Sequence, residues 1–205
     1  QEVSAPLLLD GEDLELVSIR VDGLLLQAGE FDYAGNILTI ANVPARPFTV
    51  EIENYCNPSA NTALSGLYRS NGIYCTQCEA EGFRRMAFAY DRPDAMATYL
   101  VRIEADKDEC PILLSNGNPV EAGQIAGTGR HYAVWHDPHP KPTYLFALVA
   151  GDHAVHEAHH APRVGRHVGL VRDHQHGDAA LLVERADQLH DLAPALRVQV
   201  AGGLV

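Results

Sequence analysis

The last 53 residues of this 205-residue chain are built from only ten kinds of amino acid. Residues 153–205 contain Ala, Val, Leu, Gly, Pro, His, Gln, Arg, Asp and Glu and no other type, and they hold eight of the eleven His. Every Phe, Trp, Tyr, Met, Ile, Lys and Cys lies within residues 1–152. This break predicts a domain over residues 1–152 and a tail over residues 153–205 that is not part of the native domain.

The ten amino acids of the tail are those whose codons can begin with G or C. A GC-rich gene read on the opposite strand produces this bias, because its G/C third positions become first positions. When the tail is reversed and each codon is complemented, Val205 back to Val198 admits D-E-P-T-G-N-L-D, and Gly177 back to Gly169 admits T-(V/M)-L-(V/M)-(V/I)-T-H-E-P. These segments resemble the Walker B/D-loop and switch-histidine segments of an ABC-transporter ATPase. We therefore interpret the tail as an antisense translation of an unrelated gene.

The tail also contains the zinc-hydrolase pattern His156-Glu157-x-x-His160. On a helix, the two His would lie one turn apart and bind zinc, with Glu157 beside a zinc-bound water. The gluzincin arrangement needs a Glu nineteen residues after the second His, and that position is Ala179. A chance match is unsurprising in so His-rich a tail, so we predict no catalytic zinc here.

Composition bounds the class of protein. The chain is 46% apolar and 20% charged, which is typical of a soluble globular domain. The net charge of −12 argues against nucleic-acid binding, since phosphate contacts need clustered Lys and Arg. The sequence has no apolar run long enough to span a membrane and no signal-peptide pattern. Four Cys in a chain this large do not suggest a disulfide framework, so we expect a cytoplasmic protein without a membrane partner.

Short apolar stretches separated by Gly, Asn and Pro dominate residues 1–152. In one of them, Phe48, Val50 and Ile52 alternate with polar residues, which is the period of a sheet with one wet face. Strands are expected at 14–23, 36–43, 47–56, 98–106, 131–138 and 143–152, a strand–turn–strand unit at 110–123, and a helical turn at 92–97. This spacing predicts an all-β fold, either a sandwich or an open curved sheet.

The polar stretch 57–94 interrupts this strand pattern, as binding loops on a rigid sheet do. It brings Gln77, Glu79 and Glu81 close together in sequence, ahead of Arg84 and Arg85. The Glu79 carboxylate can bind a ligand ammonium group, with Gln77 beside it. The alternative is that Glu81 and the arginines form structural ion pairs and Glu79 is a solvated loop residue.

Cys75-x-x-Cys78 in the same stretch has three interpretations. A redox motif needs a βαβ unit, and a zinc ribbon needs a second Cys pair, whereas Cys56 and Cys110 are isolated. Two ordinary thiols are therefore expected. The histidines His131, His136 and His139 flank a Pro-rich segment, "HDPHPKP", which is expected to be a loop between strands.

A family resemblance rests on two long stretches, "LSGLYRSNGIYCTQCEAEGFRRMAFAYDRPDAMATYLVRIEADKDECPILLSNGNPVEAG" and "HDPHPKPTYLFALVAGD". They are similar to the N-terminal domain of bacterial aminopeptidase N, a zinc-dependent alanyl aminopeptidase. The likeness covers about residues 1–152. It implies a saddle-shaped, mostly antiparallel β-domain, without its first strands, that precedes a thermolysin-like catalytic domain.

The resemblance also implies roles for two residues. Gln77 and Glu79 match the positions at which the family binds the free α-ammonium group of a peptide. The family's zinc-binding HExxH, its GAMEN loop and its catalytic tyrosine belong to the following domain, and this sequence does not contain them. The resemblance therefore implies a fragment that is inactive by itself, with a peptide N-terminus and the missing catalytic domain as partners.

Two alternatives belong to other functional classes. The first is a standalone β-sheet binding or scaffold module, which requires the tail to dock on the sheet. The second is a small metal-binding protein that uses His153, His156, His159 and His160 of the His-rich tract.

Overall fold

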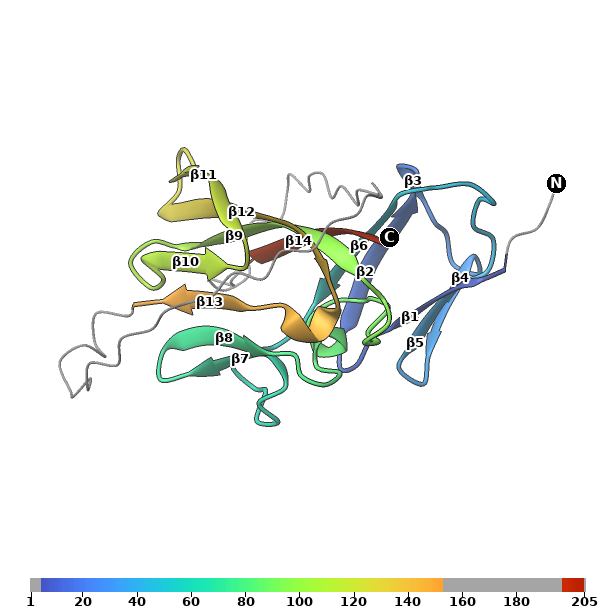
Figure 1. The fold of residues 1–205 in the computed structure, drawn as a ribbon, viewed down its shortest axis with the longest axis horizontal. Helices are drawn as coiled ribbons and strands as arrows, with labels where there is room; N and C mark the ends of the chain where they lie inside the picture. The colour runs from blue at the N-terminus through green and yellow to red at the C-terminus, as the bar shows by residue number, and fades with distance from the viewer. Residues whose placement is uncertain (1–4, 153–196, 205) are drawn as a thin grey trace.

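The computed structural model describes residues 5–152 and 197–204 of the protein. These residues form antiparallel strands in four sheets, with two 3-10 turns and no α-helix among them (Figure 1). The prediction of an all-β fold is therefore confirmed. No helix in the described part of the chain has the length and apolar character needed to cross a bilayer.

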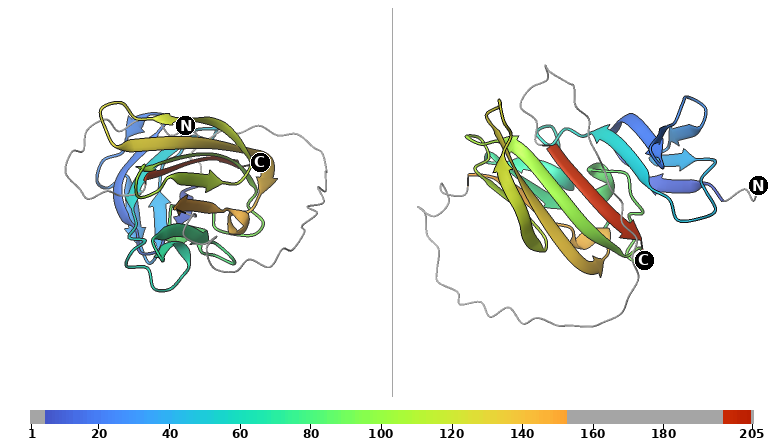
Figure 2. Two further views of the ribbon diagram at one scale, coloured as in Figure 1. Left: turned by 90° about the vertical axis from the view of Figure 1, so that its left-hand side faces the viewer. Right: turned by 90° about the horizontal axis from the view of Figure 1, so that it is seen from above.

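Two three-stranded sheets come from residues 7–55. In the first, β5 (Ile37–Ile40) lies between β1 (Leu7–Asp10) and β4 (Phe31–Ala34). In the second, β2 (Glu15–Val21) lies between β3 (Leu24–Leu25) and β6 (Val50–Tyr55). Two four-stranded sheets follow (Figure 2). The first has the order β10 (Ile112–Ser115), β13 (Leu148–Gly151), β8 (Ile73–Gln77), β7 (Gly66–Ser70). The second has the order β11 (Asn118–Gln124), β12 (Arg130–Lys141), β9 (Ala97–Asp106), β14 (Arg197–Leu204).

Each pair of sheets encloses an apolar cluster. Ile19, Leu38 and Ile40 are at most 1% exposed and form the centre of the first cluster, between the two small sheets. The second cluster is centred on β9 and β13, where Ile103 and Leu148 are fully buried. The fold therefore has two neighbouring cores.

The expected alternation along 98–106 is confirmed. Tyr99, Val101 and Ile103 are buried on one side of β9, while the residues between them are exposed or half-buried. Successive side chains of a strand point to opposite faces, so this period of two aims one face of β9 at the core.

The strand expected at 143–152 is shorter than predicted. Residues Thr143–Leu145 form a 3-10 turn, η2, closed by the Phe146 amide donating to the Thr143 carbonyl at 3.0 Å. The strand itself, β13, begins at Leu148 and lies between β10 and β8 in its sheet. Its residues on both faces are buried or half-buried, as its apolar sequence predicts.

The hairpin expected at 110–123 is wrong in its pairing. β10 and β11 exist, but β10 pairs with β13 and β11 pairs with β12, so the two strands enter different sheets. Gly117 adopts φ +87° at the turn between them, and a Cβ there would lie 2.2 Å from the carbonyl oxygen of His136. The turn therefore packs against β12 and directs β11 onto that strand.

The Pro-rich segment after His136 is not the expected loop. β12 continues to Lys141, with a break in register between Asp137 and Lys141, where pairing with β9 resumes. The nearly buried Asp137 carboxylate accepts bonds from the His139 amide and the Lys141 ammonium group, and so holds the strand together across its prolines.

The stretch 57–94 also contains a hairpin that the sequence reading missed. β7 and β8 are joined by Asn71 and Gly72, whose φ angles of +49° and +84° are those of a tight hairpin turn. Asn-Gly is the sequence signal for such a turn. The helical turn expected at 92–97 is a single hydrogen-bonded turn, in which the Ala95 amide donates to the Arg92 carbonyl at 3.1 Å.

Candidate functional site

Gln77 and Glu79 lie at the end of β8, where the chain leaves the sheet. Both are exposed, while Cys78 between them is 2% exposed and belongs to the second core. The Cys78 carbonyl accepts a hydrogen bond of 2.8 Å from the Gly82 amide, which folds residues 78–82 into a tight turn. Because Gln77 is exposed, Cys78 buried and Glu79 exposed, the alternation of β8 continues past its last residue, and the Glu79 side chain points outward.

The turn brings backbone segments very close together. A Cβ on Gly82 would lie 2.4 Å from the Gln77 carbonyl oxygen and 2.9 Å from the Gly66 nitrogen. Only glycine fits this position without displacing backbone. The 3-10 turn η1 (Phe83–Arg85) follows, and the buried Phe83 ring anchors it in the second core.

Glu79 faces a small hollow of about 190 Å³. Its wall is formed by five residues from three segments: Glu79, Ala80, Glu81, Pro93 and Tyr144. Gln77 is not part of this wall, but its side-chain amide donates to the Glu79 carbonyl at 3.4 Å. The structure therefore keeps Gln77 and Glu79 together and adds Pro93 and Tyr144 from distant parts of the sequence.

The two carboxylates of the hollow differ in their partners. Glu81 forms an ion pair of 3.4 Å with Arg84 Nη2. The Glu79 carboxylate has no hydrogen-bond or ion-pair partner within the described part of the chain. It is thus an uncompensated negative charge at the edge of a hollow, available to a cation from outside.

Asp91 holds the segments around the hollow. Its carboxylate is fully buried and accepts bonds of 3.0 Å from both the backbone amide and Nε of Arg84, and one of 2.6 Å from the Thr143 hydroxyl. Burial alone would lower the pKa of Arg84, but the hydrogen bond to Asp91 and the charges of Asp10, Asp91 and Glu81 raise it above its usual value. Arg84 therefore stays a cation that belongs to the scaffold.

Sequence reasoning located some of these groups and missed others. The alternative in which Glu81 and the arginines are structural ion pairs holds for Arg84, and also for Arg85, which pairs with Glu12 and with Asp13 at 2.9 Å. The Asp91–Thr143 bond and the place of Tyr144 were not predicted. No local signal in "KPTYLF" marks a residue that meets a loop more than fifty positions earlier.

The cysteines are free thiols, as expected. Burial, together with the charge of Asp91, raises the pKa of Cys78 to about 12. Burial also raises the pKa of Cys110 to about 11. A thiol with such a pKa is protonated at neutral pH and is a poor nucleophile and metal ligand.

No group of three or more His, Cys, Asp or Glu suited to a metal ion occurs among the residues that the structure describes. His131 instead bonds to the Cys110 carbonyl through a ring nitrogen at 2.7 Å. The tail residues His153, His156, Glu157, His159 and His160 lie outside the described residues.

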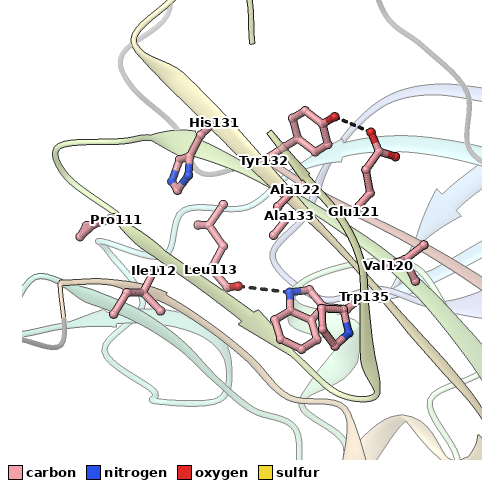
Figure 3. A pocket seen from close by; sticks show the side chains of 11 residues that line it. Pro111, Ile112, Leu113, Val120, Glu121, Ala122, His131, Tyr132, Ala133 and Trp135 are labelled. Carbon is pink, nitrogen blue, oxygen red and sulfur yellow. Dashed lines mark hydrogen bonds between the residues drawn. The ribbon is translucent and has the colours of Figure 1, made fainter. Parts of the chain in front are cut away.

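A second, larger hollow of about 470 Å³ lies between β10 and the β11–β12 hairpin (Figure 3). The Trp135 indole crosses this space and donates a hydrogen bond of 3.1 Å to the Leu113 carbonyl. Above it, the Tyr132 hydroxyl donates to Glu121, and the Arg102 guanidinium lies 3.7 Å from the centre of the Tyr132 ring. The Trp135–Leu113 bond joins the two four-stranded sheets, whereas the contacts of Tyr132 lie within one sheet, and none of them involves Glu79.

Known proteins resemble this chain over most of its described length. It is 55% identical to aminopeptidase N of Caulobacter vibrioides and 50% identical to aminopeptidase N of Escherichia coli, in each case over 166 residues. These alignments cover 80% and 81% of this chain but only 19% of each relative. The chain thus spans about a fifth of the length of these relatives.

Solved structures give the same picture. Aminopeptidase A of Legionella pneumophila, in complex with aspartic acid, superposes with a TM-score of 0.69 at 42% identity, covering 73% of this chain and 17% of that one. The M1 zinc metallopeptidase of Deinococcus radiodurans, at 16% identity, shares the fold with a TM-score of 0.60, covering 74% of this chain and 35% of that one. Residues 2–145 match the peptidase M1 N-terminal domain. The predicted resemblance is confirmed, and the chain belongs to the M1 peptidase family through its N-terminal domain.

Proposed function

We propose that this chain is the substrate-anchoring part of an aminopeptidase that removes residues from the N-terminus of peptides. In this proposal, Glu79 binds the α-ammonium group of the peptide and Gln77 assists beside it. The observation that carries the proposal is the exposed carboxylate of Glu79, which has no partner among the described residues while the neighbouring Glu81 is paired with Arg84. Membership of the M1 family supports it.

An anion at this position explains selection for a chain end. Only the first residue of a peptide carries a free α-ammonium group, and internal segments lack it. A fixed carboxylate therefore binds one end of the substrate and sets the distance to the first peptide bond. A site built to pair with a cation also rejects a blocked terminus, because the carboxylate then loses its partner.

In this proposal, the chain does not supply the hydrolytic centre. The M1 relative from Deinococcus radiodurans is a zinc metallopeptidase, but residues 5–152 of this chain contain no cluster that fits a metal ion. The role of this chain is therefore limited to binding and orientation of the substrate. The metal and the cleavage reaction belong, in this proposal, to a catalytic domain that is the partner of this one, and the isolated chain is inactive.

We also place the protein in the cytosol, without nucleic acid or membrane as partner. The four free thiols and the net charge of −12 support this placement. Localisation of a tagged full-length chain in its own host checks it, and recovery from the periplasm or membrane fraction would contradict it.

A chimeric enzyme tests the anchoring role. Residues 2–145 of this chain replace the matching segment of Caulobacter vibrioides aminopeptidase N, and hydrolysis of L-alanine p-nitroanilide is measured. Glu79→Gln should lower kcat/KM by about 10–100-fold, the range expected for a lost charge-assisted hydrogen bond. Glu81→Gln is the matched control and should stay within about twofold, because its 59% exposed carboxylate already pairs with Arg84.

Equal losses in the two variants would show a general effect of charge and would contradict the assignment. An unchanged Glu79→Gln chimera would refute it directly. The 205-residue chain alone, assayed with the same reporter and added zinc, should give only background hydrolysis.

One observation favours the standalone binding module. Part of the tail, Arg197–Leu204, forms β14 and pairs with β9, as that alternative requires. The division of the chain at Asp152 stays a prediction, and so does the His-rich metal-binding alternative. Calorimetric zinc titration of the full chain and of a chain with His156→Ala and His160→Ala tests the latter.

A further inference from the structure

The edge of β9 that faces away from β12 forms hydrogen bonds that the proposed function does not use. β9 pairs with β12 along one edge and with β14 along the other, so the sheet order is β11-β12-β9-β14 (Figure 2). We call the β14-facing backbone of residues 97–104 the outer edge of β9. It is paired over its whole length, from Arg197 opposite Glu104 to Leu204 opposite Ala97, without a register shift.

β14 is held by this edge alone. It pairs with no other strand in the described part of the chain, and it forms the border of its sheet. Residues 152–196 separate it from β13, so 45 residues of chain lie between the two strands. A strand with one partner and a long connection resembles a peptide ligand on a tether.

The outer edge of β9 needs a partner for physical reasons. β9 has ten residues, and its inward side chains Tyr99, Val101 and Ile103 sit at the centre of the second core. Leu100 on its other face is 38% exposed. A long, regular strand with an open edge and apolar residues pairs readily with another extended chain. Packing in the core fixes β9 in this extended form, so the acceptor is preformed.

We propose that the outer edge of β9 is a strand-acceptor site, filled in this chain by Arg197–Leu204 and open to exchange with the same segment of a second copy. Recognition is through the backbone ladder in antiparallel register, the mode by which sheet edges take up extended peptides. Such exchange links two copies through β9 and leaves the hollow at Glu79 unchanged. The proposal is independent of peptidase function.

A labelled peptide tests the site on the full 205-residue chain. The probe is a synthetic peptide of residues 195–205 with a fluorophore at its N-terminus, and binding is followed by anisotropy. The variant Gln199→Pro/Val200→Pro removes two adjacent N–H groups from β14. Neighbouring residues of a strand point their N–H groups to opposite edges, so one of the two faces β9. The variant thus frees the outer edge of β9.

The variant should bind the peptide at least about tenfold more tightly than the wild-type chain, because tethered β14 competes at an effective concentration in the millimolar range. A control peptide carrying the same two prolines should bind at least about tenfold more weakly than the probe. Equal binding by variant and wild type, or equal binding of the two peptides, would overturn the proposal. So would absence of binding to a variant whose near-ultraviolet circular dichroism matches the wild type.

Hydrogen exchange of the wild-type chain decides the matter even if the variant unfolds. With β14 in place, successive amides along 99–104, where β9 pairs without a break on both edges, are all protected, since alternate ones face β12 and β14. Protection of only every second amide would show an empty outer edge and would refute the proposal. Sedimentation of the wild type should then show a dimer fraction that rises with concentration and falls when excess probe peptide is added; a strict monomer at all concentrations would exclude exchange between copies.

Discussion

The Thr143 hydroxyl donates a hydrogen bond of 2.6 Å to the buried carboxylate of Asp91. This contact joins η2 to the segment that follows η1. The same carboxylate accepts a hydrogen bond from the backbone amide of Arg84. Tyr144, next to Thr143, lines the hollow at Glu79. Asp91 does not line the hollow, but it holds both the segment next to Glu81 and the segment that carries Tyr144.

Replacing Asp91 should destabilise the domain strongly. Asp91→Ala leaves Arg84 and Thr143 without their buried acceptor, so we expect a loss of roughly 2–4 kcal/mol in the free energy of unfolding. Thr143→Val removes one bond and should cost about 1 kcal/mol. Urea unfolding measures both, with Asp94→Asn as control. That carboxylate is 70% exposed and, within the described residues, pairs only with Arg92, so no change is expected. Equal effects at positions 91 and 94 would contradict the role of Asp91.

Substitutions at two glycines with positive φ should distinguish the cost of backbone strain from the cost of close packing. At Gly127 (φ +75°) an added Cβ would have no atom within 4 Å among the described residues other than its chain neighbours, whereas at Gly117 (φ +87°) it would lie 2.2 Å from the His136 carbonyl oxygen. Gly127→Ala should cost roughly 1–2 kcal/mol through strain alone. Gly117→Ala should cost about 1–3 kcal/mol more, because it also overpacks the turn before β11. Thermal unfolding of both variants is the measurement, and equal melting temperatures would contradict this packing.

The domain should lose stability at alkaline pH. The pKa of Cys78 is raised from 9.0 to about 12, so the folded state keeps its proton where the unfolded chain releases it. This contribution is complete below pH 9 and is lost as pH rises from about 9 towards 12, because the unfolded state then binds fewer protons. At about pH 10.5 the loss is about 2 kcal/mol. Urea unfolding between pH 7 and about pH 10.5 shows it, and Cys78→Ala should make the loss smaller, with the part due to the raised pKa of Cys110 remaining. A wild-type curve that is already flat above pH 9 would refute the prediction.

Tyr144 should influence affinity more than turnover. It lines the hollow but carries no charge, so in the chimeric enzyme Tyr144→Ala should raise KM severalfold and leave kcat within about twofold. Tyr144→Phe keeps the ring and should resemble the parent. A Tyr144→Phe enzyme as impaired as Tyr144→Ala would instead assign the effect to the hydroxyl group.

The fold class and most strands could be predicted from the sequence, because alternation such as Tyr99-Val101-Ile103 is local information. Pairing could not, because it depends on contacts between distant residues. The Asn-Gly pair at 116–117 gave a false hairpin, since the backbone of His136 lies against Gly117, while the pair at 71–72 closes a real one. Gln77 and Glu79 were located through family resemblance, whereas Tyr144 enters the site only through the Asp91–Thr143 bond.

The in-and-out alternation at the end of β8 restricts how this segment can change in length. Cys78 is locked into the core and Glu79 points outward only because the two positions differ by one. Inserting or deleting a single residue between Tyr74 and Cys78 would rotate the Glu79 carboxylate inward and the Cys78 thiol outward, while a change of two would restore the original orientation. Odd-numbered length changes here should therefore abolish the binding of a charged chain end that we propose for Glu79, even when every residue type is retained.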